Sequence, residues 1–288
     1  MEMTAKYAIV TPVRDEEEFI EKLILSVLNQ TVGPGKWIII NDGSTDRTEE
    51  IIKRYLSENP WIELLNLPNR RNREPGGDSI FDIGLRRLDL EQIEFLARVD
   101  ADVSFEPNYF ERMIKIFREN PRLGVASGEM AYLVDGCPKA VRGPSFQTHG
   151  PNKFYRVACF QDIGGLEKDL GWDIVDNVKA IYKGWGARRI PETQFIHYRP
   201  VGSRRGAWGI FENWGKAAYL TGYHPLFFFG KFVRRLVTYP YILGSLLMAY
   251  HYSNGFIQHK PQIVSREIKH FMQNEQLRRL FCQTSVWS

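Results

Sequence analysis

The chain has 288 residues and a formal net charge of +4, with 43% hydrophobic and 25% charged residues. This apolar content excludes a disordered polar chain and is enough to build the core of one large domain or two small ones. The three cysteines are scattered without a C-x-x-C pair, which argues against a disulfide framework or a zinc site and fits a reducing compartment. Because the first residues lead directly into an apolar run, we expect no signal peptide.

The first hundred residues alternate short apolar runs with amphipathic segments. Residues 7–12, 37–40 and 62–65 are predicted to be buried strands. Residues 16–30 repeat apolar side chains every three or four positions, which predicts a helix, and residues 45–56 predict a second helix. Apolar strands alternating with helices indicate an α/β fold, with a mostly parallel sheet that is covered by helices on both faces.

Polar residues follow two of these strands and a further, mostly apolar run at 93–97 that is also predicted to be a strand. They are Thr11-Pro12-Val13-Arg14, Asn41-Asp42 and Asp100-Ala101-Asp102. Ligands of parallel sheets bind outside the carboxyl ends of the strands, so these segments should share one edge. In an extended chain Asp100 and Asp102 point the same way, and a divalent cation shared with substrate phosphates would relieve their repulsion. The alternative is a solvated, Asp-rich turn.

Four motifs in this order resemble those of the family 2 inverting glycosyltransferases, which adopt the nucleotide-diphosphosugar transferase (GT-A) fold. They are IVTPVRDE at 9–16, INDGSTD at 40–46, RVDAD at 98–102 and GWDIVD at 171–176. The resemblance spans residues 5 to about 200. It implies a GT-A domain over residues 1–205, with a nucleotide-binding half at 1–102 and an acceptor half at 103–205. A C-terminal helical extension over 206–288 would follow.

The resemblance implies that the first two motifs hold the nucleoside of a sugar donor. Asp42 would accept a hydrogen bond from the base, usually uracil, although a turn with a helix cap would explain the same residues. Arg73 could reach the diphosphate or lie in a solvated loop, because its stretch departs from the family pattern. The nucleotide-binding residues implied in all are Thr11, Pro12, Arg14, Glu16, Asp42, Arg73, Asp100 and Ala101.

The later motifs are implied to carry the chemistry. Asp102, steadied by Asp100, would hold Mn²⁺ or Mg²⁺ against the leaving diphosphate, and His197 is either a further ligand or a structural residue. Asp173 matches the catalytic base, although an acid at a helix N-terminus is also favoured by the helix dipole. The acceptor and lid residues would be Trp172, Arg199 and Arg204.

The last third of the chain is basic and aromatic. Residues 187–288 contain 14 Lys and Arg against four Asp and Glu. The uncharged run at 236–250 is shorter than the roughly 20 residues of a membrane span, and its basic and aromatic neighbours favour monotopic membrane association over a buried helical pair. Residues 256–282 predict an amphipathic terminal helix. Nucleic acid is not an expected partner, because no recognition motif accompanies the charge.

The sequence therefore predicts a metal-dependent, inverting glycosyltransferase of the hexosyltransferase type. Its donor would be a UDP-sugar, and its acceptor a glycan or lipid-linked molecule of polysaccharide biosynthesis at the cytoplasmic face of the cell membrane. Processive synthesis is not expected, because no Gln-x-x-Arg-Trp motif follows Asp173. The alternatives are a nucleotide- or carbohydrate-binding relic of the fold and, less favoured, a nucleotidyltransferase. An NAD-dependent enzyme would need the G-x-G-x-x-G motif that the first strand lacks.

Overall fold

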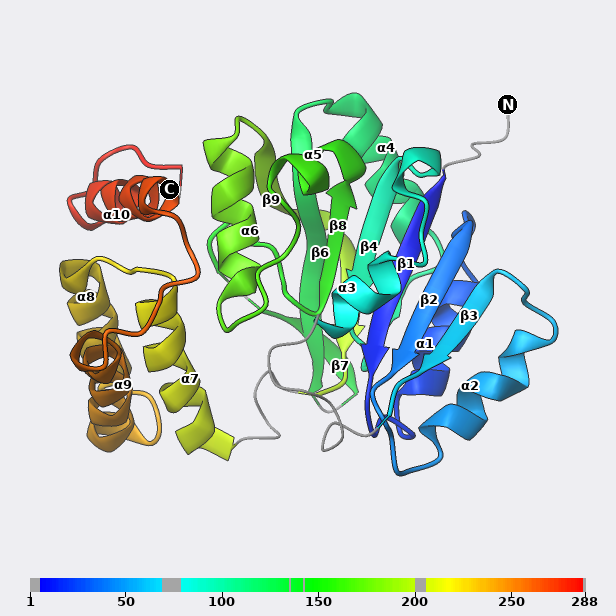
Figure 1. Cartoon of the computed structure of the whole chain (residues 1–288), viewed down its shortest axis with the longest axis horizontal. Coiled ribbons are helices and arrows are strands. Elements are labelled where there is room, and N and C mark those ends of the chain that lie inside the picture. The colour runs from blue at the N-terminus through cyan, green and yellow to red at the C-terminus, as the bar shows by residue number, and fades with distance from the viewer. Residues whose placement is uncertain (1–5, 69–78, 135, 142, 200–205, 287–288) are drawn as a thin grey trace. The chain divides into compact units, whose positions relative to one another are not determined.

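The computed structural model describes residues 6–68, 79–134, 136–141, 143–199 and 206–286. It divides into two compact units, whose elements Figure 1 colours along the chain. The sheet unit comprises Met1–Arg142, Thr148–Asp162 and Trp185–Arg199. The helical unit comprises Gly143–Gln147, Ile163–Gly184 and Pro200–Ser288. The division into domains at residues 102 and 205 stays a prediction.

Within the described residues, nine strands form one mixed sheet in the order β3-β2-β1-β4-β8-β6-β9-β5, with β7 paired to β6. The strands β3, β2, β1 and β4 are parallel, as predicted. Beyond them β8 runs antiparallel to β4 and β6, and β5 runs antiparallel to β9, so the sheet is parallel on one side and mixed on the other. The strands are β1 Tyr7–Val13, β2 Lys36–Asn41, β3 Ile62–Asn66, β4 Phe95–Val99, β5 Val103–Phe105, β6 Leu123–Val134, β7 Cys137–Ala140, β8 Asn152–Arg156 and β9 Gly186–His197.

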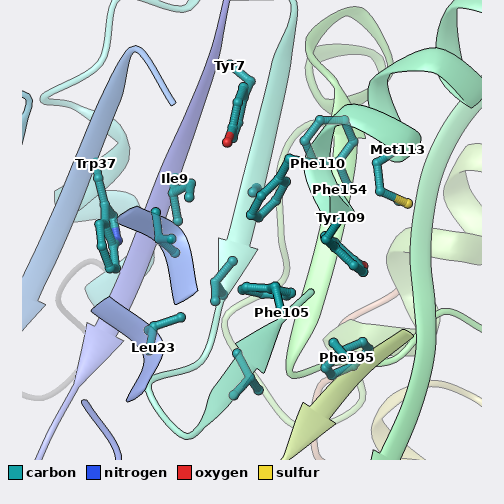
Figure 2. Packing of buried hydrophobic residues seen from close by; sticks show 14 of the residues in the cluster. Tyr7, Ile9, Leu23, Trp37, Phe105, Tyr109, Phe110, Met113, Phe154 and Phe195 are labelled. Atoms are coloured by element: carbon teal, nitrogen blue, oxygen red, sulfur yellow. The ribbon is translucent and has the colours of Figure 1, made fainter. Parts of the chain in front are cut away.

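Helices cover both faces of the sheet, which explains why the strands are apolar runs without alternation. On one face α1 (Ile20–Leu28), α2 (Thr48–Leu56) and α4 (Tyr109–Glu119) build the large core, part of which Figure 2 shows. The opposite face carries α3 (Ile80–Leu85) and α5 (Val157–Asp162). Helix α3 lies close to the sheet at Gly84, where an added Cβ would come within 2.5 Å of Ile40 Cδ1.

The first two helices begin later than the sequence predicts. Asp15 has a φ of 50°, which keeps the chain out of a helix, and α1 starts only at Ile20. Helix α2 starts at Thr48 rather than Thr45, because the Asp46 carboxylate accepts a hydrogen bond from the Thr48 N–H at 3.0 Å. Residues 16–19 and 45–47, which the sequence predicts to be helical, lie instead in the loops at the edge of the sheet.

The helical unit has a core of its own. It contains α6 (Trp172–Tyr182), α7 (Gly206–Leu220), α8 (Pro225–Arg235), α9 (Tyr241–Ile257) and α10 (Arg266–Leu280). The predicted terminal helix over 256–282 was wrong at its start, since α9 continues to Ile257 and Ser265 caps a separate α10 by accepting from the Ile268 N–H. No helix in the described ranges is both long and apolar enough to cross a membrane.

Candidate active site

Asp102 and His197 meet because of the register of two strands. Val103 of β5 lies opposite His197 of β9, and the Tyr198 N–H donates to the Asp102 carbonyl at 2.9 Å. His197 Nε2 then lies 3.3 Å from Asp102 Oδ1, with the two side chains only 6% and 13% exposed. The structure thus places these two predicted metal ligands side by side, although 95 positions separate them in the sequence.

The imidazole of His197 is held by packing on its other side. Its Nδ1 is buried and has no hydrogen-bond partner within the described residues. The ring lies against that of Tyr132, with centroids 5.6 Å apart and planes inclined by 32°. Nε2 is therefore the ring nitrogen available to Asp102 or to a bound ion.

Asp102 is a carboxylate stabilised in its ionised form. Burial alone would raise its pKa, but the hydrogen bond and charge of His197, together with the charge of Arg199, lower the pKa below the usual value. Arg199 Nε lies 3.9 Å from Asp102 Oδ2. Asp102, the predicted direct metal ligand, is thus ionised at pH values well below neutral.

Asp100 lies in a different environment. The sequence predicted that Asp100 and Asp102 extend from one strand, but β4 ends at Val99 and both residues lie in the turn before β5. Burial raises the pKa of Asp100 most, opposed by the charge of Arg98, with the charge of Asp102 raising it further. Arg98 NH1 lies 2.9 Å from Asp100 Oδ1, while about a third of the Asp100 side chain remains exposed.

The residues present fit a divalent cation that shares its site with a ligand. No group of three His, Cys, Asp or Glu side chains that could hold a metal occurs within the described residues. Mg²⁺ is commonly bound by one or two carboxylates plus substrate phosphates, with ligands at about 2.1 Å, so neighbouring ligand atoms lie roughly 3 Å apart. The 3.3 Å between Asp102 Oδ1 and His197 Nε2 suits two such ligands.

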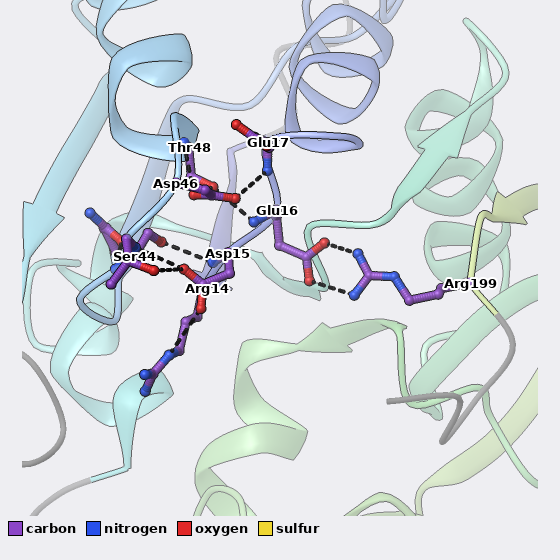
Figure 3. Close-up of polar contacts among 10 residues, drawn as sticks. Arg14, Asp15, Glu16, Glu17, Ser44, Asp46, Thr48 and Arg199 are labelled. Carbon is purple, nitrogen blue, oxygen red and sulfur yellow. Dashed lines mark hydrogen bonds and ion pairs between the residues drawn. The ribbon is translucent and has the colours of Figure 1, made fainter. Parts of the chain in front are cut away.

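The loops after β1 and β2 are tied together by hydrogen bonds (Figure 3). The Thr45 N–H donates to Asp15 Oδ1 at 2.8 Å, and the Glu16 N–H donates to Thr48 Oγ1 at 2.8 Å. The Glu17 N–H donates to Asp46 Oδ2 at 3.0 Å. These bonds make the first two motifs one structural piece, in which Asp15 and Asp46 are linking residues that sequence reasoning missed.

The residues predicted for the base pocket lie on this piece or beside it. Asp42 is buried directly after β2, and its N–H donates to the Val13 carbonyl at 2.8 Å. Thr11 is also buried, and its hydroxyl accepts from Trp37 Nε1 at 3.0 Å. Pro12 lies opposite Ile40 in the β1–β2 register and is partly exposed. Their contacts with a nucleoside stay predictions.

Glu16 joins this piece to the segment after β9. Arg199 NH1 lies 3.3 Å from Glu16 Oε1, and Arg199 NH2 binds Glu16 Oε2 (Figure 3). The Arg199 guanidinium also lies over the Phe19 ring, 4.8 Å from its centroid. Glu16 and Arg199 are 183 positions apart and their side chains are 9% and 22% exposed, so this is a largely buried ion pair. Arg199 therefore contacts Glu16 of the first motif and lies near Asp102 of the third.

The fourth motif lies in the helical unit, where it forms the first turn of α6. Asp173 is half-buried, and its carbonyl accepts from Asn177 Nδ2 at 2.9 Å. The turn depends on Gly171, which has a φ of 92° and whose added Cβ would lie 2.4 Å from Thr221 Cγ2. Trp172 opens the helix beside it. Their roles as base and acceptor contact stay predictions, while Arg73 and Arg204 lie outside the described residues.

The sequence model of the family described as "Glycosyl transferase family 2" matches residues 8–154, about half of the chain. This range holds the first three motifs and the strands that carry them. The chain belongs to glycosyl transferase family 2. Among curated members, the succinoglycan biosynthesis protein ExoA of Rhizobium meliloti is 30% identical over 186 residues, which cover 56% of this chain and 53% of that protein. The poly-beta-1,6-N-acetyl-D-glucosamine synthase of Staphylococcus epidermidis is 31% identical over 189 residues, covering 59% and 43%.

The chain spans between 11% and 53% of the length of the curated relatives it matches. The activities of those whole proteins therefore do not transfer directly to this chain. Solved structures bear on the fold. The S. aureus TarS 1–349 complex with UDP-GlcNAc has a TM-score of 0.57 at 17% identity, covering 95% of this chain and 80% of that one. The mannosyltransferase PcManGT from Pyrobaculum calidifontis, solved with GDP-Man and Mn²⁺, has a TM-score of 0.58 at 16% identity, covering 96% and 80%. These likenesses confirm the predicted GT-A fold.

Proposed function

We propose that this family member is a metal-dependent, inverting glycosyltransferase of the hexosyltransferase type. It would transfer a sugar from a nucleotide-diphosphate sugar, with a UDP-sugar as the expected donor, to a glycan or lipid-linked acceptor without processive elongation. The observation that carries the proposal is the buried Asp102–His197 pair, which is adjacent to Asp100 and bound through Arg199 to the first motif. A solvated Asp-rich turn would need none of these partners.

The proposed reaction assigns each group a task. Mn²⁺ or Mg²⁺, when held by Asp102 and His197, would supply Lewis-acid stabilisation of the charge on the leaving diphosphate. Asp173 would take the proton of the acceptor hydroxyl while the hydroxyl oxygen attacks the anomeric carbon of the donor sugar. The nucleoside diphosphate would leave from the opposite face. Thr11, Pro12, Arg14 and Asp42 would hold the nucleoside, with Asp100 and Ala101 close to the donor and Arg73, Arg199 and Arg204 near the phosphates.

The proposal is tested by measuring nucleoside diphosphate release from a panel of UDP-, GDP- and dTDP-sugars, with Mn²⁺, Mg²⁺ or EDTA. The panel needs both uracil and guanine donors, because the TarS and PcManGT complexes hold UDP-GlcNAc and GDP-Man respectively. We expect turnover of one donor class that stops with EDTA. If a donor binds but no mixture gives turnover, the binding-relic alternative is favoured. If no donor binds and none is turned over, both the enzyme and the binding-relic readings are refuted.

Glu16 is a positioning residue in this proposal. Replacing Glu16 by Gln should lower the affinity for Mn²⁺ in the presence of UDP about tenfold, or about 1.4 kcal/mol, because Arg199 would no longer be held by Glu16 and would compete for the Asp102 carboxylate. Mn²⁺ binding can be titrated by electron paramagnetic resonance.

Glu17→Gln is the matched control, since Glu17 is the next acid along the chain and pairs with Arg47 instead. The double variant Glu16→Gln/Arg199→Met should bind Mn²⁺ more tightly than Glu16→Gln in titrations without UDP, where the phosphate contact proposed for Arg199 plays no part, and a merely structural loss would not be restored in this way. Equal Mn²⁺ binding by Glu16→Gln and the parent protein would contradict the positioning role.

The setting proposed for the reaction is the cytoplasmic face of the cell membrane, with the protein bound peripherally or monotopically, as part of polysaccharide biosynthesis. Both relatives described above carry polysaccharide names, a succinoglycan protein and a poly-N-acetylglucosamine synthase. The helical unit would supply the surface on which this setting depends.

A further inference from the structure

Large apolar side chains are exposed where α8 turns into α9. Val237 is 82% exposed, Ile242 60% and Leu243 62%. We call this surface the α8–α9 corner and define it by Val233, Val237, Tyr239, Tyr241, Ile242, Leu243 and Leu246, each of which is at least 47% exposed. All seven lie within fourteen consecutive positions, which span the end of α8, the connection and the first turns of α9. Patches of this kind on soluble proteins mark interaction sites.

The packing of α9 explains why these side chains face outward. Its buried stripe consists mainly of small or slender residues, including Gly244, Ser245 and Gly255. A Cβ added to Gly215 of α7 would lie 2.2 Å from the Met248 carbonyl oxygen, and one added to Gly255 would lie 2.3 Å from the Tyr219 ring. The two helices therefore approach each other through glycines. Other apolar residues of α9 are left for another surface, since a helix needs only one stripe to pack; they include Ile242, Leu243 and Leu246.

The stretch of sequence that contains the corner carries charge of one sign. From residue 213 to residue 266 the sequence contains no Asp or Glu. Arg234 is exposed on α8 beside Val233, whereas the Lys231 ammonium donates to the Tyr223 hydroxyl at 3.3 Å, and Arg235 lies over the Trp214 ring at 3.8 Å from its centroid. Basic and aromatic residues beside an apolar patch match the headgroup region of an anionic bilayer. A second copy of the chain would bring equal positive charges together, which opposes self-association through this surface.

The corner suits the surface of a bilayer rather than its interior. Helix α9 has 17 residues and α8 has 11, and at about 1.5 Å per residue neither reaches across the roughly 30 Å of hydrocarbon. One side of α9 is also occupied by α7. Only the outer apolar residues can therefore enter lipid, to the shallow depth of an interfacial helix.

We propose that the α8–α9 corner docks on an anionic lipid bilayer, with its apolar side chains in the interfacial layer and Arg234 against lipid phosphates. The inference rests on the membrane setting of the proposed function and names the surface and the lipid chemistry involved. It does not depend on the sugar-transfer chemistry, because binding to lipid vesicles requires no donor.

The test is co-sedimentation of the full chain with vesicles of phosphatidylcholine alone or with added phosphatidylglycerol. We expect binding to the anionic vesicles that weakens with salt. The double variant Ile242→Ser/Leu243→Ser should lose at least tenfold in partitioning. Arg234→Gln should lose about fivefold on anionic vesicles alone.

The matched controls are Leu133→Ser/Val134→Ser, an adjacent exposed apolar pair on β6, and Arg54→Gln on the exposed face of α2. Both should bind vesicles as the parent does, and circular dichroism checks that every variant folds. Absence of binding by the parent protein, or equal losses in the corner and control variants, would overturn the proposal. The proposal would also be overturned if the corner variants changed only the oligomeric mass measured by ultracentrifugation, because a second copy of the chain would then be the partner of the corner.

Discussion

Replacing Asp102 by Asn is expected to reduce metal-dependent sugar transfer by more than about a hundredfold. Mutation of a residue that holds a metal ligand in place typically costs about 10–100-fold in metal affinity or activity, and loss of a direct ligand should cost more. The substitution keeps the size of the side chain but removes a carboxylate whose lowered pKa keeps it ionised at neutral pH beside His197 and Arg199. The measurement is the rate of nucleoside diphosphate release across a Mn²⁺ titration.

The matched control is Glu106→Gln, an exposed acid just after β5 that lies 3.9 Å from Arg112. It should retain activity and Mn²⁺ dependence. If Asp102→Asn lost activity but kept the Mn²⁺ affinity of the parent, Asp102 would not be a metal ligand. His197→Ala provides the second arm, since loss of Nε2 should weaken Mn²⁺ binding even though Asp102 remains.

Replacing Asp173 by Asn should reduce transfer by about 10²–10⁴-fold, the range typical of a general base, while leaving UDP binding near normal. The amide cannot accept the proton of the acceptor hydroxyl, yet it has the size of the carboxyl group. Transfer is measured as product formed at saturating donor, and UDP affinity by calorimetry with Mn²⁺. A collapse of UDP affinity in this variant would assign Asp173 to donor binding instead.

Asp169→Asn is the matched control for this variant. Asp169 is exposed and its backbone carbonyl, which accepts from the Trp172 N–H at 3.3 Å, is unchanged by the substitution. It should transfer sugar at the parental rate. Equal losses in both variants would indicate a disturbed first turn of α6 rather than a lost base.

The first half of the fold was predictable because its signals are local. Each of β1, β2 and β3 is an apolar run, and α1 buries Ile20, Leu23, Ile24 and Val27 at helical spacing. The pairing of β8 with β4 and β6 was not predicted, because antiparallel pairing of distant strands leaves no period in the sequence. Helix starts were also misplaced, because the Asp15 carboxylate accepts from the Thr45 N–H of the neighbouring loop and the Asp46 carboxylate accepts from the Thr48 N–H at the actual start of α2.

The sequence by itself determined the class of fold and the edge of the sheet where the first three motifs gather, and it predicted the acids that a metal could use. Those features follow from short-range periodicity and from the rule that parallel strands end at one edge. Only the tertiary structure decided that Asp102 meets His197 and that Arg199 meets Glu16, because strand register joins residues that are far apart in the chain. It likewise decided which side of α9 is exposed, since glycines bring that helix against α7 while Ile242, Leu243 and Leu246 stay outside.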